Sequence, residues 1–328
     1  MNSNPNRNKN PNTSSTAETR DERKTRVLLA ICVLVVMMLI LLIVLMVSKI
    51  ISPNNSHNDF HESKPESSIN STDVKYEDQL FNRSDIYAGE LILVDKEHKF
   101  VFPAQNTATV NIFNSKNTDV YILSDSKLYL NENAFSALNK MMIAFNSATG
   151  NKDACITTAY RSESDQEKLY ANNPSAYAKP GYSEYHTGND VAIKINPSTS
   201  IDNDEDGKWI TENCYRYGFI RRYPDSKVSI TGENESKYIT KQFRYVGYVH
   251  AYYMNKQNYC LEEYLEFLRE NTSASNHLSI RTDNGTQYEI YYVPASGGDL
   301  TTVSVPSNCG YTVSGDNVGG FIVTVALG

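Results

Sequence analysis

The chain has 328 residues, and its 31 Lys and Arg against 38 Asp and Glu give a formal charge of −7. This balance excludes a generally basic nucleic-acid binder, because phosphate contacts need clustered cations, so no nucleic-acid partner is expected. Apolar residues make up 40% of the chain and charged residues 21%. That is enough apolar sequence for a buried core, and it excludes a wholly disordered protein.

The first predicted element is a membrane span. Residues 27–47 are an uncharged apolar run of 21 residues, and about 20 helical residues cross a bilayer core of roughly 30 Å. Residues 1–26 carry six Lys or Arg and three Asp or Glu, a net charge of 6 − 3 = +3, and positive flanks stay in the cytoplasm. We therefore expect a single-pass protein of the cell membrane, with a cytoplasmic N-terminus and an extracellular main domain.

Composition divides the chain into five parts. Residues 1–26 are expected to be a disordered cytoplasmic tail, 27–48 the transmembrane helix and 49–75 an extracellular stalk, since the tail and the stalk are rich in Asn, Ser and Pro. The main folded domain is expected over 76–273. From residue 274 onward, short apolar runs alternate with Gly, Ser and Asn turns, a pattern that predicts a small β unit over 274–328.

Within the main domain, short apolar runs predict strands and a 3.6-residue apolar period predicts helices. Strands are expected at residues 91–94, 100–102, 120–123 and 127–130. Helices are expected at 134–147 with Gly150 beyond the end, around 166–170, after a cap at Asp206, and around 261–268.

Three ordered segments of the main domain carry a family resemblance. They cover residues 158–170, residues 181–193, and the paired stretches 209–232 and 243–268. In this order and spacing, over roughly 80–271, the sequence resembles the VanY-type D-alanyl-D-alanine carboxypeptidases. The resemblance implies an α+β fold in which helices pack on an antiparallel sheet, the D-Ala-D-Ala carboxypeptidase/hedgehog-like fold. It also implies zinc enzymes that remove the terminal D-Ala from peptidoglycan peptides.

The resemblance also locates the metal site. In the family, two His and one Asp hold zinc, from the motifs Ser-x-His-x-x-Gly-x-x-x-Asp and Glu-Pro-Trp-His-x-Arg-Tyr, and the Glu acts as the base. In this chain the ligand positions are Tyr185, Ala192 and Gln242, and the base position is Ile239. A phenol of pKa about 10, a methyl group and a carboxamide are poor zinc donors. We therefore expect no catalytic residue, no metal ligand and no cofactor, although zinc serves the family.

Neighbouring residues are candidates to replace the lost ligands. A shift of one residue on a strand reverses the side-chain direction, so His186 is expected to face away from the site, whereas Asp190 is expected to share its face. Glu233 or Glu235, in a segment longer than that of the family, is a further candidate for entering the site. His250 follows the last motif, and a hydrogen-bonded structural role is expected for it.

Three residues of the resemblance remain on the substrate side. The family implies that Arg161 holds the oxygen atoms of the peptide, a role that suits a planar bidentate donor. It also implies that Gln166 lines the same cleft and that Ser183 receives the terminal carboxylate. The alternative is purely structural: Arg161 braces a turn, Ser183 caps one, and Gln166 lies on the surface of a helix.

Three functions stay open. The first is a membrane-anchored, non-catalytic relative that binds a peptidoglycan stem peptide or a cell-wall protein. The second is an active carboxypeptidase with a rearranged site, and the third is a structural surface spacer. The missing ligands favour the first and third functions, and the retained set of Arg161, Gln166 and Ser183 favours the first.

Three further features carry weaker signals. The acidic segment 202–207 begins like an EF-hand, but its twelfth position is Asn213 rather than Glu, so a turn that caps the next helix is expected. The pair 221–222, Arg-Arg, is expected on a solvated face or a strand edge. Four cysteines lie outside the membrane span: Cys155, Cys214, Cys260 and Cys309. They allow three sets of disulfide pairs, and the sequence does not choose among these sets.

Overall fold

The computed structural model describes residues 70–328 except 107, 109, 117, 196–200 and 234–240. The expected cytoplasmic tail, the membrane span and most of the stalk lie outside the described residues. Within the described part of the chain, no helix is both long and apolar enough to cross a membrane.

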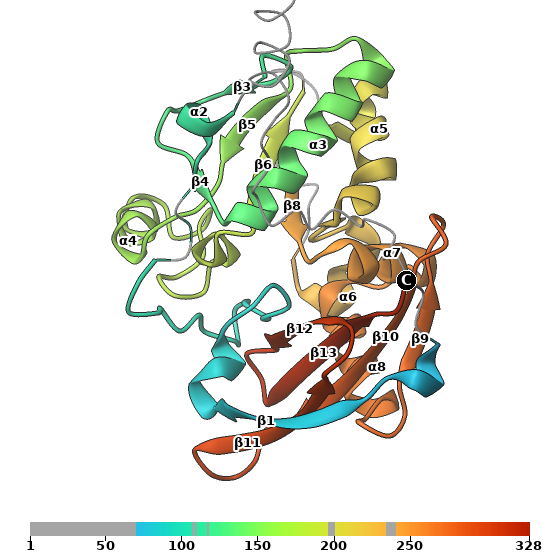
Figure 1. Cartoon of the computed structure of the whole chain (residues 1–328). Helices are drawn as coiled ribbons and strands as arrows, with labels where there is room; N and C mark the ends of the chain where they lie inside the picture. Colours follow the sequence, from blue (N-terminus) through green and yellow to red (C-terminus); the bar gives the residue numbers. More distant parts are fainter. Residues whose placement is uncertain (1–69, 107, 109, 117, 196–200, 234–240) are drawn as a thin grey trace, which may run out of the picture. The chain divides into compact units, whose positions relative to one another are not determined.

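The main sheet has five strands in the order β3 (Ile122–Leu123), β5 (Cys155–Thr158), β6 (Asp190–Lys194), β8 (Lys241–Tyr245) and β7 (Phe219–Arg221) (Figure 1). The expected combination of helices with antiparallel pairing is found in most of this sheet, but β3 and β5 run parallel. Parallel neighbours need a crossover, and a long helix between β3 and β5 provides it. The sheet is therefore mixed rather than purely antiparallel.

That long helix, α3 (Glu132–Thr149), packs with α5 (Glu205–Asn213) on one face of the sheet (Figure 1). Its buried side chains recur every three or four residues and form one apolar stripe: Ala134, Leu138, Met141, Met142 and Phe145. The helix ends at Gly150, whose φ of 74° is the left-handed conformation that glycine adopts without a steric cost. The predicted helix at 134–147 is thus found, with about one additional half-turn at each end.

Polar side chains cap the next two helices. Ser162 precedes α4 (Glu163–Asn172), and its hydroxyl accepts a hydrogen bond from the backbone N–H of Asp165. Asp204, not Asp206 as expected, caps α5, because its carboxylate accepts from the backbone N–H groups of Asp206 and Gly207. The acidic segment is therefore a helix cap, as the sequence indicated, with the capping residue two positions earlier.

The remaining elements of this part are short. The pair β2 (Val110–Asn111) and β4 (Tyr129–Leu130) forms a small antiparallel ladder. The helices that follow or flank the main strands are α2 (Ile112–Ser115), α6 (Val228–Thr231), α7 (Tyr248–Gln257) and α8 (Leu261–Asn271). Six short 3₁₀ helices occur in the described residues: η1 (Ser71–Asp73), η2 (Arg83–Tyr87), η3 (Glu184–Thr187), η4 (Ile201–Asn203), η5 (Cys214–Tyr217) and η6 (Asp225–Lys227).

The C-terminal strands form a second, antiparallel sheet in the order β12 (Gly310–Gly315), β13 (Gly320–Ala326), β10 (Gln287–Pro294) and β9 (Leu278–Arg281) (Figure 1). The intervening strand β11 (Leu300–Pro306) pairs instead with a strand from the start of the described chain. That strand is β1 (Tyr76–Asn82), and all seven of its residues have partners on β11.

Helices α7 and α8 connect this sheet to the rest of the domain through a shared apolar cluster. His250 of α7 lies inside this contact, where its Nδ1 is 2.7 Å from the Tyr264 hydroxyl and its Nε2 is 3.0 Å from the Thr324 hydroxyl. Burial lowers the pKa of His250 to about 3, so the imidazole is neutral. The structural role expected for His250 matches these contacts.

Residues 91–94 and 100–102 do not form the expected strands. Their apolar side chains are largely buried, but their backbone groups bond to a hairpin turn and a loop rather than to a ladder. Asn317 donates from its amide to the carbonyls of Leu93 and Lys99, and the Phe100 N–H donates to the Gly181 carbonyl. The apolar runs therefore indicated burial, not strand structure.

Candidate functional site

The face of the main sheet opposite α3 carries polar groups. Side chains alternate along a strand, and Val191 and Ile193 of β6 lie in the apolar core with α3. Asp190 and Ala192 therefore share the opposite face. Their partners on β8 are Arg244 for Asp190 and Gln242 for Ala192. Two of the three motif positions for metal ligands, 192 and 242, thus lie directly across from each other.

Gln242 links two carboxylates on this face. Its Nε2 donates to Asp190 Oδ1 at 2.8 Å and to Glu184 Oε2 at 3.2 Å. The second oxygen of Asp190 accepts from Arg244 Nη1 at 3.0 Å and from the Thr187 hydroxyl at 3.0 Å. The amide group at the second His position therefore has both of its hydrogens directed at carboxylate oxygens.

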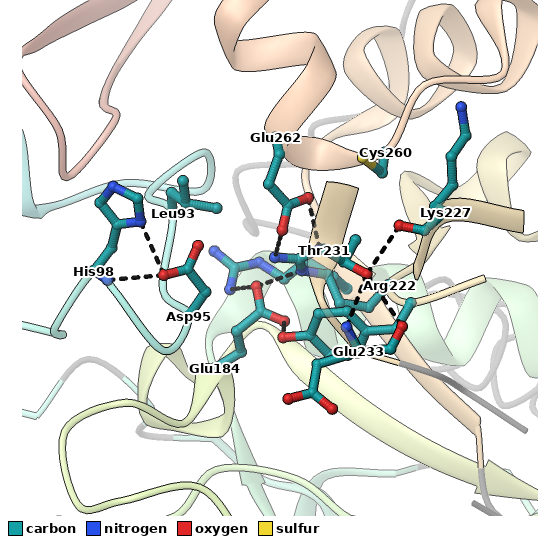
Figure 2. Close-up of polar contacts among 12 residues, drawn as sticks. Leu93, Asp95, His98, Glu184, Arg222, Lys227, Thr231, Glu233, Cys260 and Glu262 are labelled. Carbon is teal, nitrogen blue, oxygen red and sulfur yellow. Dashed lines mark hydrogen bonds and ion pairs between the residues drawn. The ribbon is translucent and has the colours of Figure 1, made fainter. Parts of the chain in front are cut away.

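A buried ionic cluster joins Arg222 to Glu184 and Glu262 (Figure 2), and Glu184 is also bonded to Gln242. Arg222 is fully buried, and its Nε donates to Glu184 Oε1 at 2.6 Å, while its two terminal nitrogens bind both oxygens of Glu262 at 2.9 and 2.8 Å. The Tyr223 hydroxyl donates to the other Glu184 oxygen at 2.8 Å. The expectation of a solvated Arg-Arg pair is wrong for Arg222, whereas Arg221 lies on the edge strand β7.

Glu184 is the most perturbed acid of this cluster. Burial raises its pKa to about 7, against the opposing effect of Arg222, and the nearby charge of Asp190 adds to the rise. The cluster formed by Glu184, Asp190 and Glu262 with Arg222 and Arg244 contains three carboxyls for two guanidinium groups. One proton shared among these acids would balance the charge, and the direction of the Glu184 shift agrees with that count.

Tyr185, at the first His position, lies against Arg161. The Arg161 Cζ is 4.5 Å from the centre of the Tyr185 ring and 5.6 Å from the centre of the Tyr177 ring. Arg161 Nη1 donates to Gln166 Oε1 at 3.2 Å, and Nη2 makes a longer contact of 3.5 Å with the Thr158 hydroxyl. Among the described residues, the partners of this guanidinium are Gln166, Thr158 and the two rings, and none is a carboxylate.

Gln166 is completely buried and is not the surface helix residue of the structural alternative. Its Nε2 donates to the Ala178 carbonyl at 2.7 Å, which turns Oε1 toward Arg161. Ser183 is also buried, and its carbonyl accepts from the His186 N–H. The structure thus brings Arg161 and Gln166 into direct contact, and Ser183 lies at the start of the η3 turn that carries Tyr185.

His186 points away from the polar face. Its Nε2 accepts from the Gly181 N–H at 3.0 Å, so its Nδ1 carries the proton and donates to the Arg161 carbonyl at 2.8 Å. Its ring stacks on Phe100 and lies edge-on to Phe102. Both ring nitrogens are therefore used in the fold. His186 faces away from the site as expected, but it does so from the η3 turn and not, as the prediction assumed, from a strand.

The other replacement candidates contribute no donor set among the described residues. Asp190 does share the face of Ala192, but it is paired with Arg244. Glu233 closes a turn with Thr231, while Glu235 and the base position Ile239 lie outside the described residues. In the described ranges, no group of three or more His, Cys, Asp or Glu side chains is arranged to hold a metal ion.

The comparisons with known proteins identify the family. Residues 127–248 match the family model described as VanY: D-alanyl-D-alanine carboxypeptidase. A D-alanyl-D-alanine carboxypeptidase of Enterococcus faecium is 33% identical over 264 residues, which are 78% of this chain and 82% of that protein. The chain belongs to the VanY family.

A solved VanY-family relative supports the fold assignment. The vancomycin resistance D,D-dipeptidase VanXYg, in complex with a D-Ala-D-Ala phosphinate analogue, aligns with a TM-score of 0.65 and 25% identity. The alignment covers 77% of this chain and 99% of that chain. The mixed α+β architecture of the VanY domain is therefore shared with a solved peptidase.

Family membership corrects the expectation that this chain has no cofactor. The VanY D,D-pentapeptidase of the VanB-type resistance cassette was solved as a variant in complex with Zn(II). It is 28% identical to this chain, and the match covers 54% of this chain and 98% of that chain with a TM-score of 0.41. One VanY protein similar to this chain thus holds zinc. The prediction of no cofactor was wrong because it rested on four motif positions alone.

The described side chains at those positions do not fit the zinc site of the family. Tyr185 covers a guanidinium, Ala192 offers no donor atom, and Gln242 directs N–H groups rather than a lone pair at its neighbours. We therefore assign no catalytic step to a metal held by these three residues.

Two features of the site were not expected from the sequence. The first is the contact of Tyr177 and Tyr185 with Arg161. Its only indication in the sequence was a tyrosine, Tyr185, at the first His position of the motif. The pairing of Arg222 with Glu184 and Glu262 joins segments 38 and 40 residues apart along the chain, and no local spacing indicates it. The four cysteines of the described residues form no disulfide with one another, which answers the pairing question that the sequence left open.

Proposed function

We propose that this VanY-family protein is anchored in the cell membrane by residues 27–48 and binds peptidoglycan stem peptides that end in D-alanine. Its domain would stand outside the cell, where the peptide is found. Support comes from the VanY family membership and from the D-Ala-D-Ala analogue bound to a relative of the same fold. Arg161, Gln166 and Ser183 are the proposed peptide-binding residues.

The observation that carries the proposal is the partner set of Arg161. Arg222 and Arg244, the two fully buried arginines of the neighbouring cluster, each bind carboxylates. The half-buried Arg161 contacts a carboxamide, a hydroxyl and two rings among the described residues. A cation removed from water needs an anionic partner, and the C-terminal carboxylate of a peptide supplies one.

We further propose that the bound peptide is held rather than hydrolysed. The family places a base at position 239, where this chain has Ile239. Glu184 and Asp190, the nearest acids to Gln242, already accept hydrogen bonds from arginine, tyrosine, threonine or amide groups. Neither is a free base positioned toward a substrate water.

A second function, active D-Ala-D-Ala carboxypeptidase, is favoured by one observation. The Enterococcus faecium relative that carries this activity in its name matches 82% of its own length at 33% identity. Hydrolysis in this chain would then depend on residues other than those at the motif positions.

One titration separates these functions. The full-length protein in detergent micelles is titrated calorimetrically with an N-acetylated peptide that ends in Lys-D-Ala-D-Ala, and released D-Ala is measured in the same samples with and without added Zn²⁺. Binding without release supports holding, and repeated turnover would establish the second function instead. No binding would overturn both and leave a structural spacer.

An arginine pair provides the matched control. Arg161→Gln is expected to weaken peptide binding by roughly tenfold or more, since a hydrogen bond to a charged group contributes about 1.5–3 kcal/mol. Arg216→Gln, which changes an exposed arginine of η5, is expected to leave binding unchanged. Equal effects of the two substitutions would contradict the assignment of Arg161.

A further inference from the structure

Two aromatic rings lie against the guanidinium of Arg161. Tyr185 lies 4.5 Å from its Cζ and Tyr177 lies 5.6 Å from it. Tyr185 comes from η3, and Tyr177 from the segment between α4 and η3. All three side chains are neither fully buried nor fully exposed, so the group borders solvent while the rings cover it.

These rings restrict how a ligand reaches Arg161. The five N–H donors of a guanidinium lie in one plane and point outward from its edge. Rings stacked on a guanidinium block approach along the normal to that plane and leave the edge accessible. A planar carboxylate binds such an edge through two parallel hydrogen bonds. The stacking therefore favours a carboxylate over a ligand that binds through one atom from above.

Hydrogen bonds hold the Tyr185 segment and the Arg161 guanidinium in register. The Arg161 N–H donates to the Tyr185 carbonyl at 3.1 Å, and His186 Nδ1 donates to the Arg161 carbonyl at 2.8 Å. Gln166 Oε1 accepts from Nη1 and is itself held through its bond to Ala178. The orientation of the guanidinium edge is therefore fixed before a ligand arrives.

We propose that Tyr185 and Tyr177 form an aromatic clamp that positions Arg161 for in-plane binding of a free C-terminal carboxylate. The clamp rests on the proposed peptide-binding function and narrows it, because peptides whose C-terminus is amidated are rejected. Tyr185 and Tyr177 are positioning residues, since they act through Arg161. The residue at the first motif position then has a role in recognition in place of metal ligation.

The test compares ring-retaining and ring-deleting variants with two probes. Full-length protein in detergent micelles is titrated with acetyl-Lys-D-Ala-D-Ala as the free acid and as the C-terminal amide. Tyr185→Leu is expected to lower the acid-to-amide affinity ratio by roughly 3- to 30-fold, the range of a cation–π contact. Tyr185→Phe keeps the ring and is expected to stay within about twofold of the wild type.

Tyr177→Leu and Tyr177→Phe repeat the comparison at the more distant ring, where a smaller loss is expected because the separation is larger. Thermal unfolding of each variant checks the fold, and the Tyr177 pair serves if Tyr185→Leu does not fold. Equal acid-to-amide ratios for the Leu and Phe variants would overturn the clamp while leaving peptide binding intact. No binding of the free acid by the wild type would overturn both proposals.

Discussion

Replacing Arg222 by Met tests whether the buried ionic cluster stabilises the fold. Arg222→Met removes three hydrogen bonds to Glu184 and Glu262, with lengths of 2.6 to 2.9 Å. Because the Arg222 side chain is fully buried, Glu262 loses its guanidinium partner, and Glu184 keeps only the longer contact of 3.7 Å with Arg244. Removal of one partner from a buried ion pair costs about 3–5 kcal/mol. For a domain of this size, that loss lowers the melting temperature by roughly 6–20 °C.

Arg221→Met is the matched control, one residue earlier in the chain. The Arg221 side chain is 27% exposed and contacts Asp202 at 3.3 Å. Exposed ion pairs contribute about 0–1 kcal/mol, so its melting temperature is expected to fall by about 4 °C at most. Differential scanning calorimetry of both variants at pH 7 measures the difference. If the two substitutions lower the melting temperature equally, the cluster does not have the stabilising role that its burial indicates.

Two further predictions concern Glu184 and the four motif positions. Burial raises the pKa of Glu184 to about 7, from a value of 4.5 in the unfolded chain. The contribution of Glu184 to the free energy of unfolding is therefore largest below pH 4.5. It declines by about 3 kcal/mol as the pH rises through 7. Glu184→Gln should therefore flatten the fall in urea-unfolding free energy between pH 5 and 8, and an unchanged slope would contradict the assignment. The four motif residues can be restored together by the substitutions Tyr185→His, Ala192→Asp, Gln242→His and Ile239→Glu. The restored protein is expected to bind zinc more tightly than the wild type in a chelator competition assay. An unchanged zinc affinity would count against the alignment of this chain with the family motifs.

The sequence predicted best where one local pattern determined the structure. The apolar period from Ala134 to Phe145 and the glycine at position 150 define α3 because both act within a few turns of one helix. The apolar residues of α8 behave in the same way. At residues 91–94 the same apolar content gave the wrong element, since the backbone partners come from Asp316 and Asn317, more than 200 residues away.

The candidate site was predictable only where the family motif is retained. Arg161 and Gln166 were identified from their motif and are in contact in the structure. The partners of Arg222 were not predictable, because Glu184 and Glu262 meet it only after β7, η3 and α8 have packed. The absence of a cofactor was inferred from single positions, and the VanY structure solved with Zn(II) corrects that inference.

The pairing of β1 with β11 affects the order in which the protein can fold. Phe81 lies opposite Thr301, 220 residues later in the chain (301 − 81). At a synthesis rate of about 5–20 residues per second, the first strand waits on the order of 10–45 s for its partner to emerge from the ribosome. During that interval Leu80 and Phe81 have no ladder to join, so a nascent chain lacking its last thirty residues would present an unpaired, partly apolar edge.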